Sequence, residues 1–89
     1  MTQKELKQII IDNGYEEIVL FENYDYVTAF IGISNDNKAI YDYDLMIEYL
    51  MKKKEEFDDE IDAIEWIDYN TIRALPYMEN APIIKYNLL

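Results

Sequence analysis

The chain has 89 residues, 51% of them hydrophobic, and its 19 acidic residues against 8 basic ones give a formal net charge of −11. It contains no histidine and no cysteine. This composition excludes a disulfide framework and a histidine-activated nucleophile. It also disfavours direct binding to nucleic acid or to an anionic membrane, because both depend on lysine and arginine side chains.

The chain is predicted to form a single domain over residues 1–89. Its aromatic content of 15% is much higher than that of disordered acidic segments, so we expect it to fold despite its self-repulsion. The apolar run at residues 9–11 is too short for a signal-peptide core or a membrane span. We therefore expect a cytoplasmic protein.

A first helix is predicted over residues 3–13. Thr2 is suited to the N-cap and Glu5 completes a capping box, while Gly14 stands where a helix commonly ends. The apolar residues of this segment recur at helical spacing: Leu6, Ile9 and Ile10.

Three strands are predicted next, at residues 17–22, 26–34 and 39–41. The first is a short apolar run expected to be buried on both faces, and the second carries Gly32, which indicates a bulge or a close backbone approach. Polar turns separate them at residues 23–25 and 35–38. Strands joined by tight turns predict an antiparallel meander.

The C-terminal half is predicted to be mainly helical. A second helix spans residues 43–54 after a capping Asp42 or Asp44, and a third begins near Asp58 and ends before Pro76. The third helix is expected to face the core through apolar residues spaced three to five apart: Phe57, Ile61, Ile64, Ile67, Ile72 and Leu75. Residues 82–86 are predicted to form an extended piece or an edge strand, which completes an α+β domain.

Enzymatic chemistry has little support in the sequence. Ser34 is the only serine and there is no histidine to activate it, while two glycines are too few for a phosphate-binding loop. Carboxylates are concentrated at residues 58–62, but the glycine-containing spacing of an EF-hand is missing. These acids are better explained as caps of the following helix. We expect neither catalysis nor a metal or cofactor.

Eight of the fourteen residues from Glu55 to Asp68 are acidic. On a helix, three carboxylates of this tract and the tyrosine that follows it would lie on one stripe: Asp58, Asp62, Glu65 and Tyr69. Glu55 and Asp59 would flank it. Carboxylates spaced in this way could imitate a nucleic-acid backbone to a basic protein surface. The alternative is a solvated face that only keeps the protein soluble.

Trp66, Tyr69 and Arg73 follow at spacings of three and four beside the acidic stripe. Residues of these types are enriched at interface hot spots, and this is the only tryptophan and the only arginine in the chain. The alternative is that Trp66 covers the core, with Arg73 stacked on it or paired with Asp62 or Asp68.

Several segments together resemble a family of small uncharacterised proteins of phages and mobile elements from low-GC Gram-positive bacteria. The longest is DAIEWIDYNTIRALPY at residues 62–77, and the others are residues 28–33, 39–44 and 81–84. The family implies no activity and no catalytic residues. Small acidic phage proteins of this size include anti-CRISPR and other anti-defence inhibitors, which is a similarity of class.

The sequence therefore predicts an α+β domain, a three-stranded antiparallel meander packed by two or three helices, that acts by binding a protein. The expected partner is a basic nucleic-acid-binding surface, such as that of a host defence nuclease. The alternative is a structural or housekeeping phage protein that forms a homodimer through an aromatic surface, with Tyr24, Tyr26, Tyr41 and Tyr43 as its patch or, instead, lining the sheet.

Overall fold

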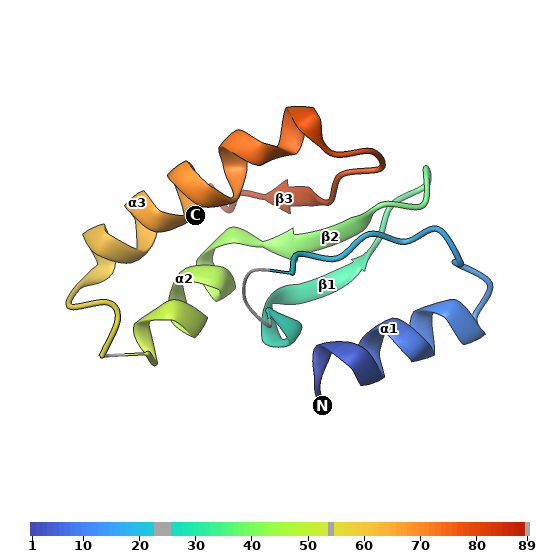
Figure 1. Ribbon diagram of the computed structural model, residues 1–89, viewed down its shortest axis with the longest axis horizontal. Coiled ribbons are helices and arrows are strands. Elements are labelled where there is room, and N and C mark those ends of the chain that lie inside the picture. Colours follow the sequence, from blue (N-terminus) through green and yellow to red (C-terminus); the bar gives the residue numbers. More distant parts are fainter. Residues whose placement is uncertain (23–25, 54, 89) are drawn as a thin grey trace.

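The computed structural model describes residues 1–22, 26–53 and 55–88 and has an α+β fold (Figure 1). Its elements in chain order are α1 (Gln3–Asp12), the 3-10 helix η1 (Val27–Ala29), β1 (Phe30–Ile33), β2 (Ala39–Asp42), α2 (Tyr43–Met51), α3 (Glu60–Asn70), the 3-10 helix η2 (Ile72–Tyr77) and β3 (Ile83–Lys85). The predicted turn at 23–25 and the predicted end of the second helix at residue 54 lie outside the described residues.

The three strands form one mixed sheet in the order β1-β2-β3. β1 and β2 are antiparallel, whereas β2 and β3 are parallel, so the predicted meander is wrong. A parallel pair requires a crossover of a dozen or more residues, and α2, α3 and η2 together provide it. The predicted C-terminal edge strand is confirmed as β3.

The segment at residues 17–22 is not a strand of this sheet, contrary to the prediction. Its apolar side chains Ile18, Leu20 and Phe21 are buried as expected, but its backbone belongs to no ladder. The strand predicted at residues 26–34 is present but shorter, as β1 at Phe30–Ile33, because residues 27–29 form η1. The predicted bulge is confirmed, since the register of β1 shifts between Phe30 and Gly32.

Helix α1 has the ends that its sequence predicts. The Thr2 hydroxyl accepts a hydrogen bond from the backbone N–H of Glu5 at 3.2 Å, and the Glu5 carboxylate accepts one from the backbone N–H of Thr2 at 3.4 Å. Gly14 follows the C-cap with φ +98°, a conformation that glycine adopts without steric cost. Helix α1 lies at one end of the molecule, away from α2 and α3 (Figure 1).

Helix α3 ends at Asn70, earlier than Pro76 would require. The side-chain amide of Asn70 donates to the backbone oxygen of Trp66 at 3.1 Å, which satisfies one carbonyl of the last turn. The chain then tightens into η2, which contains Pro76. A short 3-10 helix tolerates proline because few of its N–H groups donate within it.

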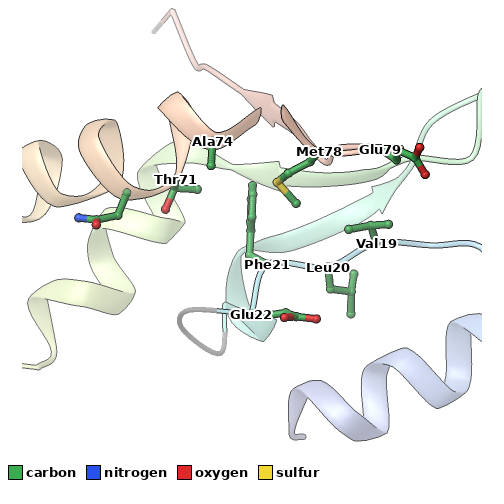
Figure 2. Close-up of a pocket in the computed structure, with 9 residues that line it drawn as sticks. Val19, Leu20, Phe21, Glu22, Thr71, Ala74, Met78 and Glu79 are labelled. Carbon is green, nitrogen blue, oxygen red and sulfur yellow. The ribbon is translucent and has the colours of Figure 1, made fainter. Parts of the chain in front are cut away.

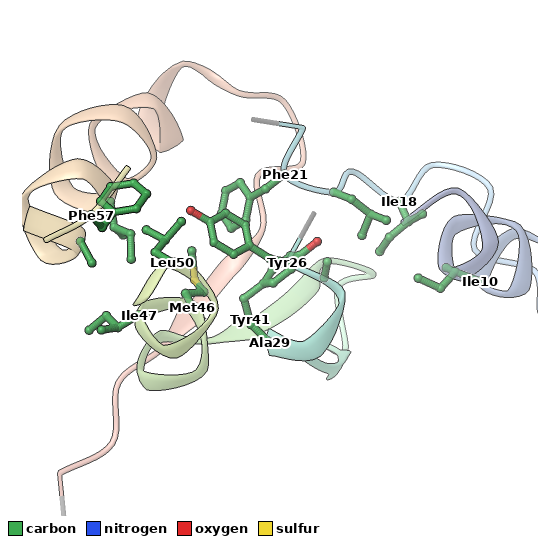
Figure 3. Close-up of a cluster of buried hydrophobic side chains, with 14 residues drawn as sticks. Ile10, Ile18, Phe21, Tyr26, Ala29, Tyr41, Met46, Ile47, Leu50 and Phe57 are labelled. Atoms are coloured by element: carbon green, nitrogen blue, oxygen red, sulfur yellow. The ribbon is translucent and has the colours of Figure 1, made fainter. Parts of the chain in front are cut away.

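The core lies between the sheet, α2 and α3, and contains an aromatic group of Phe21, Tyr26 and Tyr41 (Figure 3). The ring centroids of Phe21 and Tyr41 are 4.8 Å apart, and those of Phe21 and Tyr26 are 6.2 Å apart. On α3, Ala63 and Ile67 are completely buried, whereas Ile61 is 64% exposed. The prediction that Ile61 faces the core is therefore wrong.

The N-terminus of α2 is capped by Asp42 rather than Asp44. One carboxylate oxygen of Asp42 accepts from the backbone N–H of Leu45 at 3.0 Å, and the other accepts from the side-chain amide of Asn87 at 2.9 Å. The same amide donates to Asp44 at 3.1 Å. The bond from Asn87 and then that from Leu45 stabilise the charged form, so the pKa of Asp42 lies below its usual range.

Replacing Asp42 by alanine is expected to lower the free energy of unfolding at pH 7 by about 1–2 kcal/mol, the usual cost of losing an N-cap. A carboxyl whose pKa is lowered by folding stabilises the native state above its unfolded pKa, and this stabilisation is lost as the pH falls through the folded pKa. The difference between the parent and the variant should therefore shrink below about pH 4. Urea unfolding at pH 7 and pH 3 measures this difference in the free energy of unfolding. Asp44→Ala is the control, because it keeps the Asp42 cap.

Candidate protein-binding site

The eight residues predicted to bind a partner are not all on one helical stripe. Asp62, Glu65, Trp66 and Tyr69 lie on α3, and Arg73 lies on η2. The remaining three precede the helix: Glu55, Asp58 and Asp59. Because α3 begins at Glu60, the prediction that Asp58 shares the helical stripe is wrong. Asp59 is the N-cap of α3, and its carboxylate accepts from the backbone N–H of Asp62 at 3.0 Å.

An open groove of about 550 Å³ runs along the exposed side of α3. We call it the acid–aromatic groove, and it is lined by Glu56, Phe57, Asp62, Glu65, Trp66, Asp68, Tyr69 and Asn70. Four of the eight predicted residues belong to it. Asp68 was not among the predicted residues, although it follows Glu65 by three residues on the same helix. Phe57 and Glu56 come from the loop before α3, which helical spacing could not place.

Trp66 belongs both to the core and to the groove. Its side chain is half-buried and packs against the buried cluster, and its ring stands edge-on to Phe57 with centroids 6.3 Å apart and an interplanar angle of 85°. The alternatives of a core residue and an interface residue are therefore compatible. Packing against Phe57 positions the Trp66 ring at the groove.

Tyr69 and Arg73 form a cation–π pair on the surface. The guanidinium carbon of Arg73 lies 5.0 Å from the centre of the Tyr69 ring, and Tyr69 is 67% exposed. Arg73 was predicted to stack on Trp66 or to pair with Asp62 or Asp68. Within the part of the chain that the structure describes, it makes no such ion pair and stacks on Tyr69 instead.

Three acidic side chains of the groove, Asp62, Glu65 and Asp68, form no ion pair with a described residue. An exposed ion pair of 3.6 Å joins Lys38 and Asp36 in the turn between β1 and β2. Asp62, Glu65 and Asp68 are exposed and spaced three apart on α3, so successive carboxylates rise about 4.5 Å along the helix axis. The groove therefore presents a negative field beside three aromatic rings.

Two of the four tyrosines predicted to form a dimer patch are not on the surface. Tyr26 and Tyr41 are each 1% exposed and belong to the core, while Tyr43 is half-buried against Tyr86, with ring centroids 4.9 Å apart. Tyr24 lies outside the described residues. The dimer surface drawn from these tyrosines is thus wrong at Tyr26 and Tyr41, which line the sheet.

In residues 1–22, 26–53 and 55–88, acidic side chains form no group of three or more arranged to hold a metal ion. No helix in these ranges has the length and apolar character needed to cross a membrane. Comparisons with protein-family models, with curated proteins and with solved structures found no match for the chain.

Proposed function

We propose that this protein is a non-enzymatic inhibitor that binds a basic, nucleic-acid-binding surface of another protein through the acid–aromatic groove. The observation that carries the proposal is the combination of Asp62, Glu65 and Asp68, none of them in an ion pair within the described residues, with the half-buried Trp66 and exposed Tyr69 on one helix. Carboxylates attract and orient a basic surface, and aromatic anchors provide the apolar contact area.

The net charge of −11 favours a protein partner over nucleic acid itself. A surface that normally binds phosphates would meet the acidic side of α3 with complementary charge. The resemblance to phage and mobile-element proteins suggests that the partner is a host defence nuclease and that the inhibitor acts in the host cytoplasm. Catalysis and bound cofactors have no part in this proposal.

Displacement by DNA tests the proposed mimicry. The resin-bound protein is expected to retain a basic protein from a nuclease-treated lysate of a low-GC Gram-positive host. A DNA duplex should then release that protein, because both ligands occupy the same basic surface. Release is measured as eluted protein against duplex concentration, with a neutral polymer as the control eluent.

The purified retained protein is then examined for DNA binding. Saturation with the acidic protein is expected to abolish its complex with DNA in a mobility-shift assay. A retained protein that binds DNA equally well with and without saturating acidic protein would contradict the mimicry. A chain that only associates with itself, at a strength independent of salt, would favour the structural homodimer instead.

A further inference from the structure

A second cavity of about 400 Å³ lies between the segment at residues 19–22 and the end of the α3–η2 arm (Figure 2). The wall opposite residues 19–22 contains Thr71, Ala74 and Met78. We call this cavity the Phe21 pocket. It adjoins the acid–aromatic groove, because Asn70 lines both.

The backbone of residues 19–22 forms part of this pocket. All four residues line it, yet Figure 2 shows Phe21 pointing toward Ala74 and Leu20 pointing away from it. Side chains on both sides of an extended segment cannot all cover one wall, so the main chain itself contributes to the lining of the pocket. No backbone N–H or C=O of these four residues makes a hydrogen bond to another described residue. Such groups usually have a partner, from protein or from water.

Thr71 is a second unpaired polar group at the pocket. Thr71 as a residue is only 3% exposed, and its hydroxyl makes no hydrogen bond to any residue that the structure describes, but its oxygen is not fully shielded from solvent. Figure 2 shows the hydroxyl oxygen turned away from the helix that carries it. Because the oxygen is open to solvent at this point, a ligand in the pocket can form a hydrogen bond with it.

The rim of the pocket is acidic. Glu22 and Glu79 line it from the two walls, and both are exposed to solvent. Neither makes an ion pair within the described residues. The walls between them are mixed: Asn70 and Thr71 are polar, whereas Phe21 and Met78 face the cavity in Figure 2.

We propose that the Phe21 pocket binds an extended segment of the basic partner and receives one arginine side chain from it. This inference rests on the proposed function and names a second contact of the same partner. The segment pairs its backbone with residues 19–22, as peptides do when they add to a free strand edge. The arginine stem lies along Phe21 and Met78, and its five N–H groups reach the rim carboxylates and the Thr71 hydroxyl.

A short peptide with a single arginine tests the proposal: acetyl-Thr-Val-Arg-Val-Thr-amide, titrated into the full chain and followed by NMR of the backbone amides. Shift changes are expected at residues 19–22 and at Thr71 and Ala74, with slower amide exchange at residues 19–22. Citrulline in place of arginine, and methylation of the peptide's backbone nitrogens, should each weaken binding by at least about threefold. A lysine peptide that binds as well as the arginine peptide would overturn the choice of arginine.

Two variants locate the site. Ala74→Phe fills the cavity and is expected to weaken peptide binding at least about tenfold, whereas Thr71→Val keeps the shape and should weaken it about threefold. Thr71→Val should fold as stably as the parent, because the lost hydroxyl has no internal partner. The Thr71→Val variant therefore still tests the pocket if Ala74→Phe fails to fold. The charge control is Glu22→Gln with Glu79→Gln, compared with Glu48→Gln and Glu60→Gln on another surface.

Peptide binding that is unchanged by Thr71→Val and by the Glu22/Glu79 pair would overturn the inference. The proposed function fails separately. If substitutions in the acid–aromatic groove leave the protein partner bound while Thr71→Val weakens peptide binding, the inference about the pocket is supported and the proposed function of the groove is contradicted. If the groove substitutions release the partner while Thr71→Val leaves peptide binding unchanged, the proposed function of the groove is supported and the inference about the pocket is contradicted.

Discussion

Replacing Ile67 by alanine is expected to lower the free energy of unfolding by about 2–5 kcal/mol, whereas Ile61→Ala should change it by less than about 0.5 kcal/mol. Both are isoleucines of α3, but Ile67 is completely buried and Ile61 is 64% exposed. Deleting buried methyl groups removes apolar burial and leaves a cavity, while an exposed side chain leaves neither. Domains are stable by only about 5–15 kcal/mol, so the first loss is large.

Urea unfolding followed by tryptophan fluorescence measures both variants against the parent. Trp66 is on the same helix and packs against the buried cluster, so it reports on this region directly. Equal losses for the two variants would mean that α3 is rotated and that Ile61 faces the core, as the sequence spacing suggested. Unfolding followed by circular dichroism controls for an effect confined to the surroundings of Trp66.

This pair of residues illustrates why the orientation of α3 could not be predicted. Apolar residues occur on several sides of the helix, so spacing alone did not select one face. Tertiary packing selects the buried face, and it buries Ala63, whose small side chain gives a weak hydrophobic signal. The resulting core face passes through Ala63 and Ile67 and leaves Ile61 in solvent.

Features that depend on neighbouring residues were predicted well. The capping box of Thr2 and Glu5, the positive φ of Gly14, the Asp42 cap and the bulge at Gly32 each depend on a few adjacent positions. Strand pairing is different, because β2 pairs with β3 from the far end of the chain. An apolar run can also be buried without joining a sheet, as residues 18–21 are, since β propensity reflects burial rather than a particular partner.

The candidate site also contains some residues that sequence periodicity could select and others that it could not. Asp62, Glu65, Trp66 and Tyr69 could be selected because helical periodicity keeps them on one side of α3. Phe57 reaches the groove only through the loop that brings it against Trp66. The Phe21 pocket joins residues about fifty positions apart, and no local pattern indicates such a cavity.

Reversing three carboxylates of the acid–aromatic groove to lysine is expected to slow association with the basic partner at least about tenfold at low salt. The variant is Asp62→Lys, Glu65→Lys and Asp68→Lys, which replaces three attractions by three repulsions. All three side chains are exposed and Ile67 is untouched, so the fold should persist. The difference in association rate between the variant and the parent should decrease between about 0.1 M and about 1 M salt, because the Debye length shortens from about 10 Å to about 3 Å.

A matched control separates the position of the charges from their sum. Glu16→Lys, Glu17→Lys and Glu48→Lys also reverse three exposed carboxylates, and both variants move the net charge from −11 to about −5. Because the control leaves the groove intact, its association should slow by less than about threefold, through the weaker overall field alone. Association rates measured by surface plasmon resonance at both salt concentrations compare the two. Equal rates for the groove variant and the control would reduce the acidic side of α3 to a solvated face, since only the total charge would then matter.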